Sequence, residues 1–285
     1  MKDIQIKKSE EQSSQPGQEN KMTPEPISIR DNYNGSDKLK DKVVLLTGGD
    51  SGIGKSIALH FAREGAHLAI IYLSEDDDAR QTMAEIENEG TRCLLLKGDI
   101  KDEEFCIKAV NKTISHYGSL NCVINNAAMQ FPAEHIEEIT SANLHTTFET
   151  NIYPYFYIVK AAIGFLNEND TIINTTSVTA YRGSEHLIDY ASTKGAIVSF
   201  TRSLSKSLAK KGIRVNAVAP GPIWTPLIPA TFNGEDLENF GKDVPLGRPG
   251  QPAEVAPAYV YLASQDSSYM TGQVLHVNGG EIIGG

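Results

Sequence analysis

The sequence predicts an α/β fold in which one doubly wound sheet of seven parallel strands forms a single domain. From Asp41 onward, short apolar runs rich in β-branched residues alternate with longer segments that have one polar face. This alternation is typical of βαβ units, whose parallel strands are buried on both faces of the sheet. A chain of 285 residues also suits one α/β domain. Finally, a glycine cluster follows the first apolar run, where such folds turn from strand into helix.

The apolar runs predict seven strands, which we place at residues 42–47, 67–73, 92–97, 120–125, 171–176, 214–218 and 273–277. Helical patterns between them predict helices at residues 52–64, 77–89, 102–116, 140–165, 187–210 and 252–263. Residues 224–249 interrupt the alternation with proline and glycine. An insertion after a strand's carboxyl end is where a substrate lid would lie, so we expect a lid there.

The first 38 residues differ in composition from the rest. They are rich in Glu, Gln, Ser, Lys and Pro and have neither helical nor strand periodicity. Such a composition predicts an extended arm rather than a domain. We therefore assign residues 1–38 to an arm, lying along the body or along a neighbouring subunit, and residues 39–285 to the domain.

Charge and cysteine content narrow the possible partners and the compartment. A net charge of -10 argues against nucleic acid or an anionic membrane as a partner, because both attract basic surfaces. Cys93, Cys106 and Cys122 form no C-x-x-C pattern, which favours reduced thiols. No apolar run reaches the roughly 18 residues of a membrane span, and no signal-peptide core begins the chain. We expect a cytoplasmic protein.

The first strand runs into the sequence TGGDSGIG at residues 47–54, and a helical pattern follows. Gly48, Gly52 and Gly54 would permit a tight turn and a close approach of the backbone to a ligand. The free N–H groups of the following helix would bind a pyrophosphate. A glycine cluster alone is often only a turn, but its place between strand and helix predicts a dinucleotide site. No G-x-x-x-x-G-K-[ST] pattern supports a nucleoside-triphosphate loop.

The end of the second strand normally selects the cofactor, because an acid there bonds a ribose 2′-hydroxyl and a base accommodates a 2′-phosphate. Here Tyr72 is followed by Leu and Ser, which offer neither charge. The acidic run at residues 75–78 would repel a 2′-phosphate, which favours NAD over NADP; an acidic first helical turn is the alternative interpretation. Asp99 would either contact adenine or cap the helix that begins near Asp102.

Tyr190 and Lys194 are four residues apart on a predicted helix, so their side chains share one face. A neighbouring ammonium favours phenolate, and we therefore expect it to lower the Tyr190 pKa from its usual value near ~10. Such a pair could exchange a proton with an alcohol or carbonyl oxygen. The spacing alone more often marks a helix surface with an extended Lys side chain.

Several further motifs occur in one order along the chain: NNAA at residues 125–128, Asn151, Ser177, YASTK at residues 190–194 and APGPIWT at residues 219–225. Together with the glycine loop, they make residues 40–285 resemble the classical short-chain dehydrogenase/reductase family, which has a Rossmann-type fold. Two departures stand out. Ala128 replaces the usual Gly, and the second strand ends without a diagnostic charge.

The resemblance implies roles for four catalytic residues. Tyr190 would transfer the proton, Lys194 would lower the Tyr190 pKa and hold the nicotinamide ribose, and Ser177 would bond the substrate oxygen. Asn151 would hold a water that links Lys194 to solvent, although a helical Asn bonded locally or at a kink is the alternative. The cofactor would contact Gly48, Ser51, Gly52, Ile53, Gly54, Tyr72, Asp99, Ile100, Asn126, Ala127, Tyr190, Lys194, Pro220, Gly221, Ile223 and Thr225.

The resemblance also implies hydride transfer between NAD(P) and a small alcohol or carbonyl compound. With Ser177, the substrate would meet Met129, Gln130, Phe131, Val178, Thr179, His186 and Trp224. No His forms a ligand pair with Cys or a carboxylate, so we expect no metal.

Members of the family are commonly tetramers that pair two long helices, here 140–165 and 187–210, and bury the C-terminal segment. The apolar residues expected to fit this pairing, or an ordinary core, are Ile152, Phe156, Val159, Ile197, Phe200 and Leu204. A redox-sensing or scaffolding protein that binds a dinucleotide without turnover is the alternative function. It predicts the loss of a proton-transfer residue, whereas all four are present.

Overall fold

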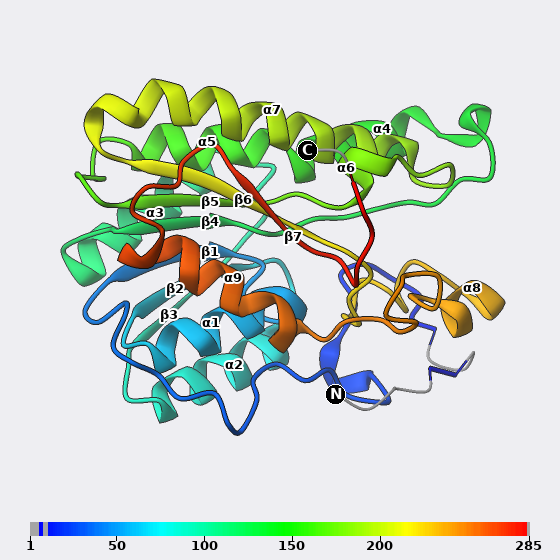
Figure 1. The fold of residues 1–285 in the computed structure, drawn as a ribbon, viewed down its shortest axis with the longest axis horizontal. Coiled ribbons are helices and arrows are strands. Elements are labelled where there is room, and N and C mark those ends of the chain that lie inside the picture. Colours follow the sequence, from blue (N-terminus) through cyan, green and yellow to red (C-terminus); the bar gives the residue numbers. More distant parts are fainter. Residues whose placement is uncertain (1–5, 8–10, 284–285) are drawn as a thin grey trace.

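Seven parallel strands form one sheet in the order β3-β2-β1-β4-β5-β6-β7 in the computed structural model, which describes residues 6–7 and 11–283 (Figure 1). The remaining residues of the predicted arm, 1–5 and 8–10, and the last two glycines lie outside the described residues. The strands are β1 (Val43–Thr47), β2 (His67–Tyr72), β3 (Cys93–Lys97), β4 (Cys122–Asn125), β5 (Thr171–Thr175), β6 (Arg214–Pro220) and β7 (Val274–Val277). The predicted doubly wound sheet is confirmed.

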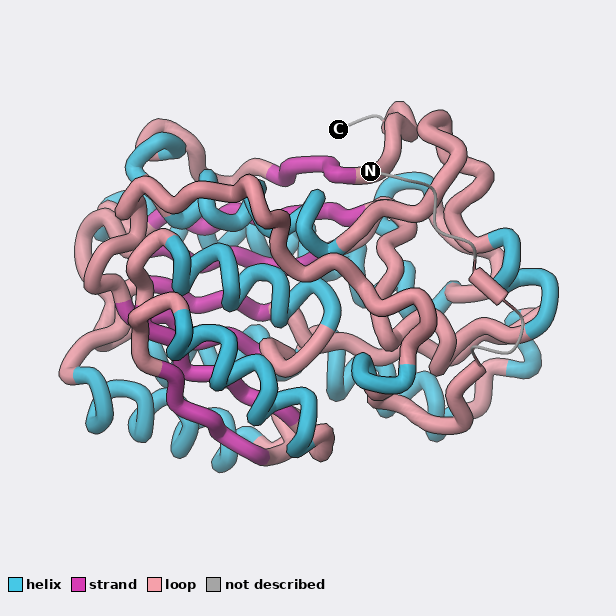
Figure 2. The backbone as a smooth tube through the Cα atoms, turned by 90° about the horizontal axis from the view of Figure 1, so that it is seen from below, coloured by secondary structure: helices cyan, strands magenta, loops and turns pink. Residues whose placement is uncertain are grey.

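Helices cover both faces of the sheet (Figures 1 and 2). One layer holds α1 (Gly52–Arg63), α2 (Asp76–Asn88) and α9 (Pro252–Ala263). The other holds α3 (Glu103–Tyr117), α4 (Ser141–Asn151), α5 (Tyr153–Ala162) and α7 (Ile188–Leu208). Shorter helices are α6 (Thr179–Arg182) and α8 (Gly234–Asn239), and the 3-10 turns are Glu19–Lys21, Ile136–Glu138, Ala209–Lys211 and Gln265–Ser267.

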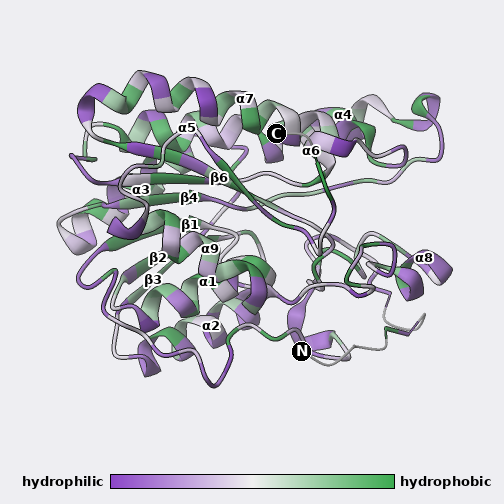
Figure 3. Ribbon diagram, in the orientation of Figure 1, coloured by the Kyte–Doolittle hydropathy of each residue, from purple (hydrophilic) through white to green (hydrophobic). Residues whose placement is uncertain are grey.

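Two apolar cores lie between the sheet and the helical layers. The alternation of side chains along β1 sends Val44 and Leu46 into the core beneath α1 and α9, and Leu45 into the core beneath α3 and α5. Hydrophobic residues follow the strands, whereas α2 and α8 are largely hydrophilic (Figure 3). Within the described residues, no helix is long and apolar enough to cross a membrane.

The predicted helix at residues 140–165 is wrong, because two helices, α4 and α5, occupy this segment. The break lies at Ile152, whose φ of -131° and ψ of -41° depart from helical values. Pro154 causes it: proline has no N–H to donate to the carbonyl of Thr150. The N–H of Tyr155 instead bonds the carbonyl of Ile152 at 3.2 Å.

The N-terminal arm, as far as it is described, runs along the helical layer of α1 and α2 and reaches the region of α8 (Figure 1). Its later part is tied to the domain by a carboxylate. Glu64, at the end of α1, accepts hydrogen bonds from the hydroxyl of Tyr33 at 2.7 Å and from the N–H groups of Ser36 and Lys38 at 2.9 and 3.1 Å. The arm therefore lies against the body of its own chain.

Candidate active site

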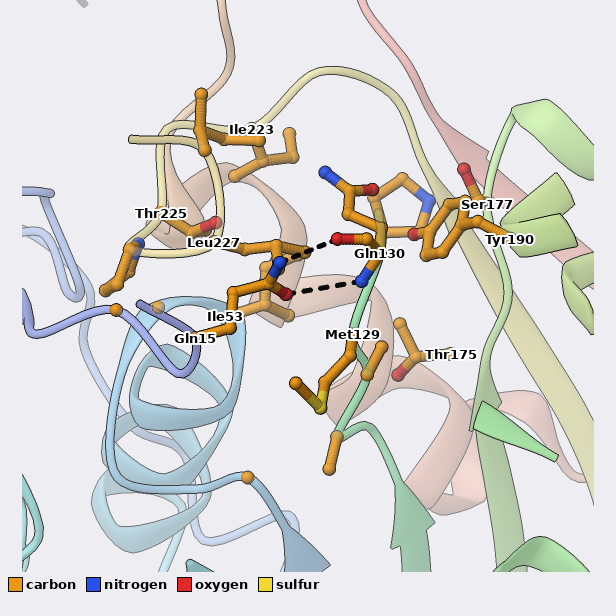
Figure 4. A pocket seen from close by; sticks show the side chains of 18 of the residues that line it. Gln15, Ile53, Met129, Gln130, Thr175, Ser177, Tyr190, Ile223, Thr225 and Leu227 are labelled. Carbon is orange, nitrogen blue, oxygen red and sulfur yellow. Dashed lines mark hydrogen bonds between the residues drawn. The ribbon is translucent and has the colours of Figure 1, made fainter. Parts of the chain in front are cut away.

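A pocket of about 790 Å³ opens at the carboxyl ends of the strands. Every residue predicted to contact the cofactor lines it, from Gly48 in the glycine loop to Thr225 in the predicted lid, residues 224–249. The predicted substrate residues Ser177, Met129, Gln130 and His186 line the same pocket. Figure 4 shows Ser177 and Tyr190 at one side of it and Ile53 at the other.

The glycine loop has the close packing that a pyrophosphate cradle needs. A Cβ on Gly54 would lie 1.7 Å from the carbonyl oxygen of Gly48, so no side chain fits there. Gly48 has a φ of +61°, which favours glycine. Asn126 holds the loop by donating to the carbonyls of Thr47 and Gly48 at 3.2 and 3.1 Å. This backbone, followed by the N-terminus of α1, fits the diphosphate of a dinucleotide.

Ser177, Tyr190 and Lys194 meet beside this cradle. Ser177 and Tyr190 lie side by side in the pocket wall (Figure 4), and the Nζ atom of Lys194 lies 5.2 Å from the centre of the Tyr190 ring. Lys194 is buried, and its Nζ donates to the carbonyl of Thr175 at 3.0 Å. β5 ends just before Ser177, and α7 carries the other two residues. The arrangement places a hydroxyl, a phenol and an amine around one point in the pocket.

Residues 48–281 match the family model described as "Enoyl-(Acyl carrier protein) reductase". An uncharacterized oxidoreductase, YhdF, of Bacillus subtilis is 58% identical over 272 residues, covering 95% of this chain and 94% of the relative. The glucose and ribitol dehydrogenase of Daucus carota is 47% identical over 282 residues, covering 97% of this chain and 97% of the relative.

The chain belongs to the short-chain dehydrogenase/reductase family. It is an NAD(P)-dependent oxidoreductase, as its relatives and structural neighbours indicate. Among solved structures, a short-chain dehydrogenase of Burkholderia cenocepacia in complex with NADP superposes with a TM-score of 0.81 at 27% identity, covering 85% of this chain and 98% of that one.

The pKa values of the Tyr–Lys pair of this short-chain dehydrogenase/reductase differ from the expectation. Burial raises the pKa of Tyr190 to about 12, although the hydrogen bond with Ser177 acts in the opposite direction. Burial also lowers the pKa of Lys194 to about 7, because the ammonium loses its hydration. The predicted lowering of the Tyr190 pKa by Lys194 is therefore not what this structure gives, because desolvation is the largest cause of the shift and it raises this pKa.

Asn151, at the end of α4, does not line the pocket. Its side-chain amide is occupied: Oδ1 accepts the N–H of Met129 and Nδ2 donates to the carbonyl of Met129, both at 2.8 Å. Nδ2 also reaches the hydroxyl of Thr193 at 3.3 Å. The side chain thus supports the loop after β4, through a partner that lies 22 residues away in the sequence.

Trp224 is not a pocket residue, so the prediction that it meets the substrate is wrong. The side chain is 0% exposed, and its Nε1 donates to the carbonyl of Pro24 in the arm at 2.7 Å. It packs with Met22 and Ile228 in a small core between the arm and the lid. Phe131 also lies outside the pocket lining.

Three pocket residues come from the arm and were not predicted: Gln15, Pro16 and Gly17. Their polar, aperiodic surroundings in the sequence give no signal of a binding site. The alternative role of Asp99 as a helix cap is wrong, because Asp102 caps α3 by accepting the N–H of Glu104 at 2.9 Å. Asp99 lines the pocket instead.

Carboxylates surround the pocket at both ends. Asp50 and Glu75 line it beside Tyr72, and burial, followed by the charges of Glu75 and Asp78, raises the pKa of Asp50 to about 7. The acidic side chains near His186 and the lid are Glu134, Glu185, Asp236 and Asp243. Among the described residues, no group of three His, Cys, Asp or Glu side chains could hold a metal ion.

Proposed function

We propose that the protein transfers a hydride between NAD(H) and a small uncharged alcohol or carbonyl compound, with Tyr190 as the acid/base group. The observation that carries this proposal is that Tyr190 and Ser177 lie together beside the buried Lys194, in the pocket that the glycine loop also lines. A hydroxyl, a phenol and an amine placed in this way can bind and protonate one oxygen atom.

The bound cofactor supplies or accepts the hydride. In reduction, Ser177 would donate a hydrogen bond to the substrate carbonyl oxygen, and Tyr190 would give its proton to that oxygen. In oxidation, phenolate at Tyr190 takes the proton from the hydroxyl. Protonated Lys194 favours that phenolate by charge. Its pKa of about 7 lets Lys194 gain or lose a proton near neutral pH.

The catalytic role of Asn151 belongs to its backbone in this proposal. Its side chain is hydrogen-bonded to Met129. At the helix break, however, its backbone carbonyl loses its usual helical donor. The N–H of Tyr155, the usual helical donor to Asn151, bonds Ile152. We propose that the carbonyl of Asn151, freed from this helical donor, holds a water that links Lys194 to solvent.

The charge around the pocket supports an uncharged substrate. Glu134, Glu185, Asp236 and Asp243 would repel phosphorylated or carboxylated compounds. A chain of net charge -10 is also a poor partner for an acidic carrier protein, although the matching family model is described by such a substrate. This charge is compatible with neutral polyols, sugars and aldehydes, and the Daucus carota relative is a glucose and ribitol dehydrogenase.

NAD is the proposed cofactor because carboxylates lie where a 2′-phosphate would add negative charge. Asp50 and Glu75 line this part of the pocket, whereas the nearby Lys97 and Lys101 pair with Asp76 and Asp99 at 2.7 and 3.4 Å. The Burkholderia cenocepacia structure contains NADP, so its cofactor differs from the one proposed here, and the preference of this chain needs a direct measurement. We expect NADH to bind about tenfold more tightly than NADPH in fluorescence titrations. Equal or tighter binding of NADPH would overturn the assignment.

We also propose a cytoplasmic homotetramer. Large apolar side chains are exposed on α4 and α5, among them Leu144, Tyr153 and Phe156, and an interface between subunits would bury them. Of the residues expected to fit the pairing, Ile152, Val159 and Ile197 are instead buried in the core of the subunit. The three free cysteines are compatible with a reducing compartment.

Tyr190→Phe tests the mechanism. Removing the hydroxyl should lower kcat by about 10²–10⁴-fold while the Kd for NADH changes little, because only proton transfer is lost. The readout is nicotinamide absorbance with a panel of polyols, sugars and aldehydes. Tyr269→Phe, at a fully exposed position, is the matched control. Equal rates for Tyr190→Phe and wild type would contradict the mechanism. NADH binding without turnover of any compound would favour the redox-sensing alternative.

A further inference from the structure

Gln130 joins three parts of the chain at the substrate side of the pocket. The side chain of Gln15, in the arm, donates from Nε2 to the carbonyl of Gln130 at 2.6 Å and accepts its N–H at 3.3 Å (Figure 4). The side chain of Gln130 donates to the hydroxyl of Thr231 in the lid at 3.3 Å. The arm, the loop after β4 and the lid are therefore connected through one buried residue.

Neighbouring Met129 is held in the same way by a side chain of α4. Asn151 makes two hydrogen bonds with the Met129 backbone, just as Gln15 does with Gln130. Two consecutive pocket residues are thus each fixed by a side-chain amide, one from α4 and one from the arm. The loop that presents their side chains to the substrate owes half of this support to the arm.

A buried carboxylate anchors the arm four residues after Gln15. Glu19 is 3% exposed, and its Oε2 accepts the N–H of Gly52 in the glycine loop at 2.6 Å. Its Oε1 lies 3.2 Å from the Nζ of Lys55, which also pairs with Glu85 at 3.0 Å. Asp78 accepts the N–H of Glu19 at 2.8 Å. If the arm moved away, Lys55 would lose Glu19 and remain buried with one carboxylate fewer, which costs free energy. The Glu19–Lys55 pair therefore fixes the arm's position.

The arm is also attached to the lid. The N–H of Gln12 donates to the carbonyl of Pro229 at 2.8 Å, and Trp224 donates to the carbonyl of Pro24. A Cβ on Gly17 would lie 2.2 Å from the carbonyl oxygen of Pro226, so the two backbones pack closely. The arm thus runs between the glycine loop and the lid.

We propose that the N-terminal arm is a specificity element of the substrate site, in which Gln15 is a positioning residue for Gln130 and the lid, and Glu19 anchors Gln15. Among the described residues, no hydrogen bond or ion pair joins the arm to Ser177, Tyr190 or Lys194. The arm consequently shapes substrate binding without touching the groups that move the proton. The kinetic part of this proposal rests on the proposed oxidoreductase function.

Gln15→Ala is the first test. Loss of its two hydrogen bonds should raise KM for the alcohol or carbonyl substrate about fivefold or more, while kcat and the Kd for NADH stay within about twofold. Ser13→Ala, at an exposed position of the same arm, is the control. An unchanged KM in Gln15→Ala, or an equal loss of NADH binding, would overturn the proposal.

Glu19→Gln tests the anchor, with the exposed Glu25→Gln as the control for the same loss of charge. If Glu19 acts through Gln15, the two substitutions should not add: the double variant should show a KM no higher than about that of the more affected single variant. KM increases that multiply in the double variant would contradict the anchoring role.

Hydrogen exchange separates this proposal from the proposed function. Gln15→Ala should speed exchange of the Gln130 amide at least about fivefold, whereas Ser13→Ala should not. If no compound is turned over, the proposed function fails, but faster exchange at Gln130 still supports the positioning role. Unchanged exchange at Gln130 would overturn it whatever the activity.

Discussion

At the scale of single residues, the Tyr190–Lys194 pair is governed by burial. Their spacing in the sequence predicts that they share a helix face, and the structure places Nζ 5.2 Å from the ring centre. Sequence shows which charges are neighbours, but desolvation depends on how the whole pocket packs. It therefore could not reveal that burial raises the Tyr190 pKa and lowers that of Lys194.

The lowered pKa of Lys194 has a consequence for stability. The Lys194 pKa is about 7 in the folded chain and 10.5 as its ordinary value. Between these two pH values the unfolded chain binds more protons at this site than the folded chain does, so the free energy of unfolding rises with pH. Lys194→Met lacks this contribution. The difference in free energy of unfolding between wild type and Lys194→Met should grow in favour of wild type by about 2 kcal/mol between pH 7.5 and 9. Urea unfolding at matched protein concentration measures it, and a constant difference would contradict the prediction.

Other single residues show the same limit of sequence reasoning. The motif order identifies Asn151 as a site residue, but its amide supports Met129 rather than facing the pocket. Trp224 follows a strand end, where a pocket residue is expected, yet its indole is covered by the arm. Which way a side chain turns depends on partners that lie about 20 to 200 positions away in sequence.

At the scale of elements, the strands and most helices could be predicted, because their apolar periodicity depends on local sequence. The predicted ends of the strands differ from the observed ends by at most two residues. The helix at 140–165 failed because its apolar pattern continues through Pro154, where the backbone hydrogen bonding does not. The strand ends and the glycine loop then bring the predicted cofactor residues to one pocket.

The glycine loop gives a prediction at this scale. Gly54→Ala would force a Cβ to within 1.7 Å of the carbonyl oxygen of Gly48, so the loop backbone must shift. We expect NADH binding to weaken by about tenfold or more, measured by fluorescence titration. Gly164→Ala, where a Cβ would meet nothing within 4 Å, is the control and should bind as wild type does. Wild-type affinity in Gly54→Ala would count against the cradle.

At the scale of the whole molecule, the arm is what sequence predicts least. Its polar, aperiodic composition indicates a segment without a core of its own. It nevertheless lies along the domain because buried carboxylates on the body and in the arm meet backbone N–H groups across the boundary between them. Pairings of this kind leave no periodic pattern in the sequence.

Assembly is the second question at this scale. Phe156 is 47% exposed on α5, where the proposed tetramer would bury it. In light scattering we expect four times the mass of one chain for wild type and a smaller mass for Phe156→Glu, because an interface cannot easily bury a carboxylate. Ile27→Glu, an exposed apolar position on the arm, should keep the wild-type mass. A monomeric wild type would refute the tetramer.

The position of Gln15, Pro16 and Gly17 in the pocket wall changes where the boundary of a working enzyme should be drawn. The match to the family begins at residue 48, whereas the wall of the pocket begins at residue 15. A recombinant fragment trimmed to the matching region would keep the Rossmann-type core and lose one side of its binding site. Relatives that share the matched region but have different segments before it are then expected to differ in the substrates that they bind. Substrate preference should therefore be compared between full-length chains.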